Sequence, residues 1–288
     1  AQAALRDSEQ RLRQADRRKD EFLATLSHEL RNPLAPIRTA ARLLGDPMLG
    51  AAETVWVQGV IQRQVTHMAL LLADLLDVAR ITQGKLELRR ARVDLAGVID
   101  AAVESARPLI DARRHALAVT MPEGDVSLDA DPVRLAQVVA NLLTNAAKYT
   151  DPGGRIELRV DCDDAATRIA VRDSGIGLDA AALPELFVMF SQVRGTERRS
   201  EGGLGIGLAL VKGIVELHGG SVSAHSAGPG HGSEFVVSLP RASDDAAAAA
   251  SVGDGATAGT ATRRVLVADD NVDAAESLAM LLRLAGHE

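Results

Sequence analysis

Apolar residues recur at alternating spacings of three and four through the first part of the chain. These positions form a heptad seam with two weak members: Leu5, Ser8, Leu12, Ala15, Lys19, Phe22 and Leu26. A seam of this kind predicts a long helix that packs against another helix along one stripe. A second apolar stripe runs through residues 52–82 and ends before Gly84, so the sequence predicts a helical hairpin over residues 1–84.

The second stripe is also apolar along its length. Its members are Val57, Val60, Ile61, Gln64, Met68, Leu71, Leu72, Leu75 and Val78. Two helices cannot enclose such stripes on both sides, whereas two hairpins packed together can. We therefore expect a homodimer in which residues 1–84, a coiled-coil helix leading into a dimerisation hairpin, form a four-helix bundle with His28 on its outer face.

From residue 85 onward, strand-like runs alternate with helical stretches. The strand-like runs are 86–95, 115–122, 126–130, 155–161, 168–175, 221–228 and 233–240. The helical stretches are near 94–112, 131–149 and 205–218, and Asp131-Pro132 opens the second of them with a capping residue and a first-turn proline. This order predicts an α/β sandwich over residues 85–240, with one mixed sheet covered by helices.

The C-terminal part has a different texture. Residues 241–262 are rich in Ala, Gly, Ser and Thr without a core-forming period, which predicts a flexible linker. Residues 263–288 begin a new unit, with an apolar strand expected at 265–268, the acids Asp269 and Asp270 at its end, and an amphipathic helix after them.

The composition narrows the functional classes. With 288 residues, 47% of them hydrophobic, the chain has room for two domains with cores. A net charge of −7 and an aromatic content of 2% argue against a nucleic-acid surface, and the single Cys162 excludes an intrachain disulfide framework. Since no apolar stretch reaches transmembrane length and no signal peptide opens the chain, we expect a cytoplasmic fragment whose sensor, and any membrane anchor, lie upstream.

Residues 27–34 read Ser-His-Glu-Leu-Arg-Asn-Pro-Leu. The Glu29 carboxylate can accept the Nδ1 proton of His28 and leave Nε2 free to attack phosphorus. Asn32 follows one helical turn later on the same face, within reach of a water or phosphate at the ring. Pro33 should bend the helix after this turn. A proline-kinked helix with an incidental histidine would explain the bend but not the other residues.

The helix expected at 131–149 carries polar residues on one face. Asn141, Asn145, Lys148 and Tyr149 follow spacings that bring them together, so carboxamide oxygens can hold a hard cation while the ammonium meets phosphate oxygens. A solvated helix face is the alternative interpretation. Two asparagines one turn apart are nevertheless poor helix formers on a mostly apolar helix, which favours a functional role.

Two glycine-rich segments follow. Asp173 ends an expected strand directly before Gly175 and Gly177, where a carboxylate can accept the exocyclic amine of adenine. The run GGLGIGLAL (202–210) leads into the next helix, and its glycines, with Gly203, Gly205 and Gly207 among them, expose backbone N–H groups to polyphosphate. A tight turn would explain either glycine run alone, but not the ordered set.

These segments together resemble a bacterial sensor histidine kinase of the hybrid type. SHELRNPL resembles the family's H-box, NLLTNAAKYT (141–150) its N-box, DSGIGL (173–178) its G1-box, LFVMFSQ (186–192) its F-box and GGLGIGL (202–208) its G2-box. GHGSEF (230–235) resembles the last glycine motif before the final strand. The resemblance covers residues 1–240 and implies a Bergerat-type ATP-binding fold for residues 85–240.

The resemblance implies a role for each matching position. It implies that His28 is the phosphoacceptor with Glu29 as its base, and that Asn32 positions water for dephosphorylating the partner regulator. For the cofactors ATP and Mg²⁺ it implies Asn145 as the principal magnesium ligand with Asn141 nearby, Asp173 on adenine, and Lys148 and Tyr149 near the nucleotide.

Two further segments take their interpretation from this resemblance. Residues 194–203 are charged and read as a lid over ATP, with Arg194, Arg198 and Arg199 able to meet phosphates and with Phe187 and Phe190 as packing anchors; an ordinary solvated loop is the alternative. Residues 263–288 resemble the start of a response-regulator receiver domain, with Asp269 and Asp270 matching its metal-binding acids. The receiver's phosphoacceptor aspartate is not in this sequence.

The implied function is ATP-dependent autophosphorylation of His28 and transfer to a receiver aspartate, in this protein or a separate one, with phosphatase activity as well. A non-catalytic, ATP-gated dimer scaffold of the wider gyrase, Hsp90 and MutL superfamily is the competing interpretation. The His-Glu-x-x-Asn helix discriminates against it, because those chains lack such a helix. An enzyme that acts mainly as a phosphatase stays open, since the sequence does not set that balance.

Overall fold

The computed structural model describes residues 2–163, 165–189, 191, 205–241, 264–268 and 272–287; within residues 2–22 and 272–274 it describes the backbone only. Contacts divide the chain into two units, Ala1–Ala246 and Ala247–Glu288. In the described part of the chain, no helix is both long and apolar enough to cross a membrane.

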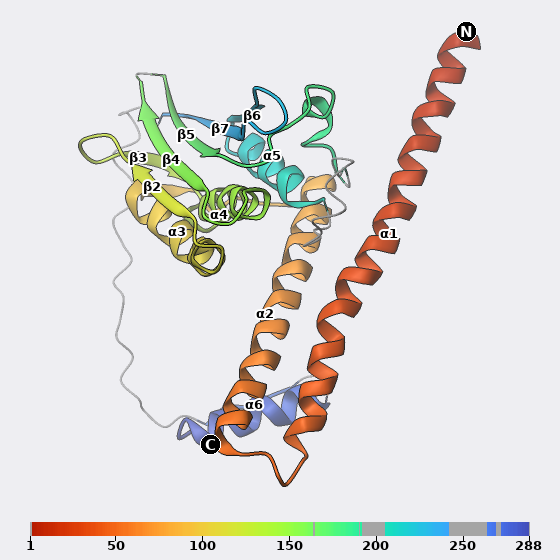
Figure 1. The fold of residues 1–288 in the computed structure, drawn as a ribbon, viewed down its shortest axis with the longest axis vertical. Helices are drawn as coiled ribbons and strands as arrows, with labels where there is room; N and C mark the ends of the chain where they lie inside the picture. Colours follow the sequence, from red (N-terminus) through yellow and green to blue (C-terminus); the bar gives the residue numbers. More distant parts are fainter. Residues whose placement is uncertain are drawn as a thin grey trace. The chain divides into compact units, whose positions relative to one another are not determined.

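Two long helices form the predicted hairpin (Figure 1). Helix α1 spans Gln2–Leu44 and continues through Pro33 and Pro36, and helix α2 spans Ala51–Thr82 and packs beside it. The seam residues before Leu23 lie among those described by backbone only. The hairpin leaves large apolar side chains exposed: Leu23, Leu34, Leu43, Leu44, Met48, Val55, Trp56, Val65, Leu70, Leu72 and Leu76.

A five-stranded mixed sheet forms the centre of the second part of this unit. Its order is β2 (Ala116–Thr120), β4 (Arg155–Cys162), β5 (Ala166–Asp173), β7 (Ser233–Pro240) and β6 (Ser221–His225). The β2–β4 pair is parallel and the other pairs are antiparallel, so the predicted mixed sheet is confirmed.

A separate two-stranded sheet corrects the prediction of a single sheet. Strand β1 (Ala91–Asp94) pairs antiparallel with β3 (Ser127–Ala130) and with no strand of the larger sheet. The first half of the strand expected at 86–95 stays irregular, because its backbone finds other partners. Arg89 N–H donates to Asp131 Oδ2 at 2.9 Å, for example, which leaves only a short β1.

Three helices cover one face of the larger sheet (Figure 1). They are α3 (Leu95–Ala112), α4 (Pro132–Tyr149) and α5 (Gly207–Leu217), in the order the sequence predicts. Asp131 caps α4 as expected, since its Oδ1 accepts from Val133 N (3.1 Å) and Arg134 N (3.2 Å).

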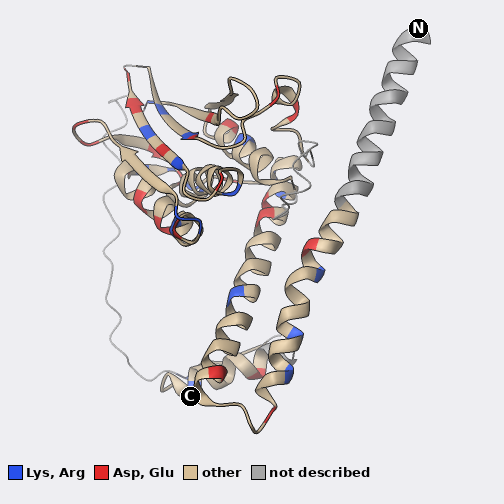
Figure 2. Ribbon diagram, viewed as in Figure 1, with Lys and Arg blue, Asp and Glu red and all other residues tan. Residues whose placement is uncertain are grey.

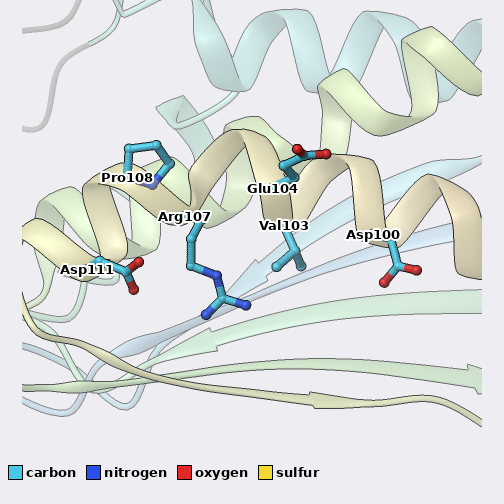
Figure 3. Close-up of a pocket in the computed structure, with 6 residues that line it drawn as sticks. All are labelled: Asp100, Val103, Glu104, Arg107, Pro108 and Asp111. Carbon is cyan, nitrogen blue, oxygen red and sulfur yellow. The ribbon is translucent and has the colours of Figure 1, made fainter.

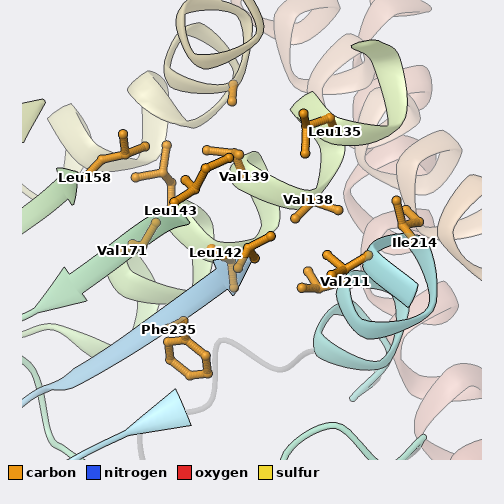
Figure 4. Close-up of a cluster of buried hydrophobic side chains, with 14 of the residues drawn as sticks. Leu135, Val138, Val139, Leu142, Leu143, Leu158, Val171, Val211, Ile214 and Phe235 are labelled. Carbon is orange, nitrogen blue, oxygen red and sulfur yellow. The ribbon is translucent and has the colours of Figure 1, made fainter. Parts of the chain in front are cut away.

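The core lies between this helical layer and the sheet. Alternate residues of β4 are buried (Ile156, Leu158 and Val160), which is the period expected of a sheet with one covered face. Figure 4 shows the apolar side of α4 between sheet residues such as Leu158 and Phe235 and the α5 residues Val211 and Ile214. On the opposite, uncovered face of the sheet, basic and acidic residues alternate along β4 (Figure 2).

In the second unit, helix α6 spans Val272–Leu284, and residues 264–268 form no strand. The strand predicted at 265–268 was therefore wrong for this chain. A strand needs a neighbouring strand for its backbone hydrogen bonds, and the described residues of this unit include no other strand. Asp269 and Asp270 lie outside the described residues.

Candidate active site

Asp173 ends β5 and is only 5% exposed. Its register partner on β7 is Ser233, whose N–H donates to Asp173 Oδ1 at 3.3 Å and whose hydroxyl donates to Oδ2 at 2.5 Å. Gly175 N–H also donates to Oδ1, at 2.8 Å. Because a carboxylate has about four lone-pair sites, Oδ2 keeps capacity for a further donor, such as the amine of a purine.

The glycines beside Asp173 permit contacts that no other residue would allow. A Cβ atom on Gly175 would lie 2.3 Å from the Tyr149 carbonyl oxygen, and the next residue, Ile176, donates its N–H to that same oxygen at 3.1 Å. Gly177 has φ +67°, and its Cβ would lie 2.1 Å from the Gly228 oxygen. The G1-like turn is therefore packed against the end of α4 and the loop after β6.

That loop is fixed by Ser226, which the sequence reasoning missed. Ser226 Oγ accepts from Leu178 N at 3.0 Å and donates to the Gly232 carbonyl at 2.7 Å. Gly232 in turn has φ +71° and a Cβ position only 2.0 Å from the Asp173 carbonyl oxygen. Ser233 was missed too. Its place directly after the Gly-His-Gly turn was the available signal, but its role depends on the β5–β7 register.

The polar face of α4 leads to this turn, which contacts the end of the helix at the Tyr149 carbonyl. Asn141, Asn145 and Lys148 are half-buried, and Asn141 Nδ2 is a buried donor without a partner in the described part of the chain. Desolvation raises the pKa of the Tyr149 hydroxyl above its usual value, so it stays a hydrogen-bond donor at neutral pH. These groups fit a polyanionic ligand, because they include an unused donor and an ammonium.

The same face fits a Mg²⁺ ion held jointly with a ligand. Mg²⁺ prefers oxygen donors and keeps several non-protein ligands in nucleotide sites. Within the described ranges no cluster of His, Cys, Asp and Glu is arranged to hold a metal ion. The sequence predicts the carboxamide oxygen of Asn145 as the protein ligand of this ion, and this assignment stays a prediction.

Helix α5 begins at Gly207 without a side-chain cap, since Ile206 makes no capping hydrogen bond. Gly205, just before it, has φ +66°, and a Cβ on Gly207 would meet nothing within 4 Å. The start of α5 therefore presents backbone N–H groups of the kind that bind phosphate. Gly203 lies outside the described residues.

The F-box segment is anchored by packing, as expected for Phe187. The Phe187 and Phe235 rings meet edge to face, with centroids 6.4 Å apart. Met189 Sδ lies 3.8 Å from Thr82 Oγ1, at the end of α2. Phe190 and the arginines Arg194, Arg198 and Arg199 fall outside the described residues.

The histidine block lies on α1. His28 and Asn32 are exposed and Glu29 is half-buried. Among the described residues no hydrogen bond joins Glu29 to the His28 ring, which agrees with the different directions that successive helical residues take. The roles of these three residues stay predictions, and exposure of His28 leaves its ring accessible to a second domain.

Comparison with known protein families divides the chain in the same way as the fold. Residues 18–84 match the family "His Kinase A (phospho-acceptor) domain", which contains His28. Residues 130–243 match "Histidine kinase-, DNA gyrase B-, and HSP90-like ATPase", which contains α4, Asp173 and the glycine turns.

Individual proteins show the same likeness. Sensor protein GacS of Pseudomonas syringae pv. syringae is 34% identical over 239 residues, covering 81% of this chain and 26% of GacS. Sensor histidine kinase RcsC of Salmonella typhimurium is 36% identical over 245 residues, covering 82% of this chain and 25% of RcsC. The chain thus spans about a quarter of the length of these curated relatives.

Among solved structures, the full-length crystal structure of ShkA in complex with AMPPNP is 30% identical with a TM-score of 0.57, covering 92% of this chain and 54% of ShkA. The helical hairpin and the α/β domain both have counterparts in histidine kinase structures of this kind. By its two domain matches and these relatives, the chain belongs to the histidine protein kinases, a family of ATP-dependent phosphotransferases.

Proposed function

We propose that the protein phosphorylates its own His28 from ATP and passes the phosphoryl group to an aspartate of a response-regulator receiver domain. The observation that carries the proposal is one chain with two complementary parts. An exposed histidine lies on a helical hairpin, and Asp173, which is buried and accepts hydrogen bonds, lies at the end of strand β5 in an ATPase-type domain. An acceptor and a nucleotide site in one chain are what an autokinase needs.

Each part of the nucleotide has a group that suits it. Asp173 Oδ2 accepts the adenine amine, and the glycine turn at Gly175 lets the backbone approach the ring. Bound Mg²⁺ would offset charge on the phosphates, with Asn145 as its protein ligand. Asn141 and Lys148 contribute donors, as do the N–H groups of Gly205 and Gly207 and, in the same motif, Gly203.

The phosphoryl transfer needs the His28 ring to be neutral and oriented. Glu29 accepts the proton at Nδ1, after a change of its rotamer, so that the Nε2 lone pair attacks the γ-phosphorus. A P–Nε2 bond forms while the bond to the β,γ-bridging oxygen breaks, and ADP carries away that electron pair. Asn32, on the same face as His28, positions a water molecule that dephosphorylates the partner regulator by hydrolysis.

The assembly we propose is a homodimer through the hairpin. Its exposed apolar residues, such as Leu70 at 61% and Leu76 at 56% exposure, cannot be covered within one protomer. The receiver domain that takes the phosphoryl group belongs to a separate regulator, to the protein's own C-terminal part beginning near Asp269 and Asp270, or to both.

The test is phosphate incorporation from ATP by His28→Gln. We expect this variant to lose acid-labile, base-stable phosphate while keeping nucleotide affinity. His67→Gln is a matched control, because His67 is an exposed histidine on α2. Residual phosphohistidine in His28→Gln would move the acceptor elsewhere. Nucleotide binding without any phosphohistidine in the unmutated protein would favour the ATP-gated scaffold instead.

A further inference from the structure

The C-terminal end of α2 holds α4 through a polar cluster, which we call the latch: Asp74, Asp77, Arg134 and Gln137. Arg134 forms an ion pair with Asp77, whose side chain is 7% exposed. Gln137 Nε2 donates to Asp74 Oδ1 at 3.1 Å and to Asp77 Oδ2 at 3.3 Å, and Gln137 Oε1 accepts from Arg134 at 2.9 Å. The latch joins the hairpin to the ATPase-type domain.

An apolar contact lies beside the latch. Val78 of α2 belongs to the domain's buried core, and a Cβ on Gly213 of α5 would come within 2.8 Å of Ile81 Cγ2. Such close approach is possible only with glycine at this position. The latch and this contact together define a docked arrangement in which α2 touches both α4 and α5.

The latch shares a helix face with the candidate nucleotide site. Asn141 follows Gln137 by one turn, Asn145 follows Asn141 by one turn, and Lys148 comes next, so these side chains form one row along α4. The row begins at the latch carboxylates and ends at the groups expected to meet the phosphates. Asn141 lies between them in the row, and its Nδ2 has no hydrogen-bond partner among the described residues.

The charge of Asp74 is coupled to this row. Burial raises the pKa of Asp74 above its usual value; the Gln137 hydrogen bond and the charges of Lys148 and Arg134 oppose this, while the Asp77 carboxylate adds to it. Asp74 therefore interacts electrostatically with Lys148, at the far end of the row. Negative charge placed at one end is felt at the other, because this face is partly shielded from solvent.

We propose that docking and nucleotide binding oppose each other through charge: Asp74 and Asp77 hold the ATPase domain on α2, and the Asp74 carboxylate, whose charge is not balanced within the latch because Arg134 pairs with Asp77, repels the phosphates of a nucleotide on the same face of α4. The inference rests on the proposed function, since it needs a nucleotide at Asn145. Coupling of this kind is reciprocal. Nucleotide binding loosens the dock, which frees the domain to bring its nucleotide to His28.

The first test measures nucleotide affinity by calorimetry with Mg-AMPPNP. Asp74→Asn keeps an acceptor for Gln137 but removes the charge, and we expect it to bind the nucleotide about five-fold more tightly or better, the lower end of typical coupling. Asp100→Asn is the matched control. Asp100 lies on α3 and lines a surface pocket with Glu104, Arg107 and Asp111 (Figure 3). Removing its charge should leave the nucleotide affinity unchanged.

The second test traps the dock by a disulfide. A Cβ built on Gly213 lies 3.7 Å from Ile81 Cβ, within the range of about 3.5–4.5 Å that a disulfide requires. The double variant Ile81→Cys/Gly213→Cys, in a Cys162→Ser background, should form this bond on oxidation. We expect Mg-AMPPNP to slow its formation, and the oxidised protein to bind the nucleotide more weakly until reduced.

The outcomes separate the inference from the function on which it rests. Unchanged affinity in Asp74→Asn, or faster disulfide formation with nucleotide present, would overturn the coupling while leaving the kinase intact. Failure of the unmutated protein to bind Mg-AMPPNP would instead overturn the proposed function, and the inference with it. If Asp74→Asn and Asp100→Asn raised the affinity for Mg-AMPPNP equally, the cause would be the change in net charge of the protein. That result would overturn the role of the latch.

Discussion

Asp173→Asn separates recognition of adenine from folding. The amide oxygen still accepts from Gly175 N and Ser233 N, and the Ser233 hydroxyl can turn to accept from the new amide. Asp173→Ala lacks this property. It leaves the buried N–H of Gly175 and the half-buried N–H of Ser233 without this acceptor, and the buried group alone would lower the free energy of unfolding by about 1–3 kcal/mol.

The expected loss in Asp173→Asn therefore falls on the ligand. A carboxylate that accepts from the adenine amine makes a charge-assisted bond, whose removal costs about 1.5–3 kcal/mol, or about ten- to a hundredfold in ATP affinity. Inosine triphosphate carries a carbonyl oxygen in place of that amine. The asparagine amide can donate to this oxygen, so the preference for ATP over inosine triphosphate should narrow or reverse.

Calorimetric titration of both nucleotides into the unmutated protein and Asp173→Asn gives the two affinity ratios, and thermal unfolding checks that the variant is folded. Asp100→Asn should leave both affinities unchanged. An unchanged ATP affinity in a folded Asp173→Asn would refute the adenine assignment. So would a variant that loses ATP and inosine triphosphate by the same factor, because the amide would then make no distinction at the purine edge.

Three further outcomes follow from the structure. Leu26→Asp with Leu72→Asp should dissociate the dimer, since burying the charges costs several kcal/mol; light scattering that finds the unmutated protein monomeric at micromolar concentration would contradict the four-helix bundle. Gly177→Ala should lower the free energy of unfolding by about 1–3 kcal/mol, because φ at this position is +67° and the new Cβ would meet the Gly228 carbonyl oxygen. Gly97→Ala should cause no such loss, because a Cβ at Gly97 meets nothing within 4 Å, and urea titration compares the two variants. Asn145→Ala should abolish phosphohistidine formation and the Mg²⁺ dependence of ATP binding, both measured directly; unchanged Mg²⁺ dependence would remove Asn145 from the metal site.

The sequence pattern predicted the elements well where local signals were strong. The apolar period of residues 131–149 and the Asp131-Pro132 start give α4 within a residue, because capping and amphipathicity are local properties. The prediction of a strand at 265–268 was wrong because a strand depends on contacts that are not local. A strand is completed by its neighbours, and an apolar run alone does not supply them.

The site was predictable in its chemistry but not in its supports. Asp173 and the glycines stand out in the sequence, whereas Ser226 and Ser233 act through loop and strand pairings between distant segments. The latch could not be predicted from the sequence for the same reason, since Asp77 and Arg134 are 57 residues apart and become partners only when α4 packs against α2.

Helix α4 is the element through which these parts act on one another. Its start is fixed by Asp131, whose N–H donates to His218 Nε2 at 3.0 Å, so that His218 Nδ1 carries the proton and donates to the Ile214 carbonyl of α5 at 2.8 Å. Asp131 Oδ2 also accepts from Arg89, in the segment that leaves α2. Because α4 is close-packed against the sheet, it cannot bend to absorb a push at the latch. A change at α2 must therefore either break the hydrogen bonds and the ion pair of the latch or move α4 and its asparagines as one body.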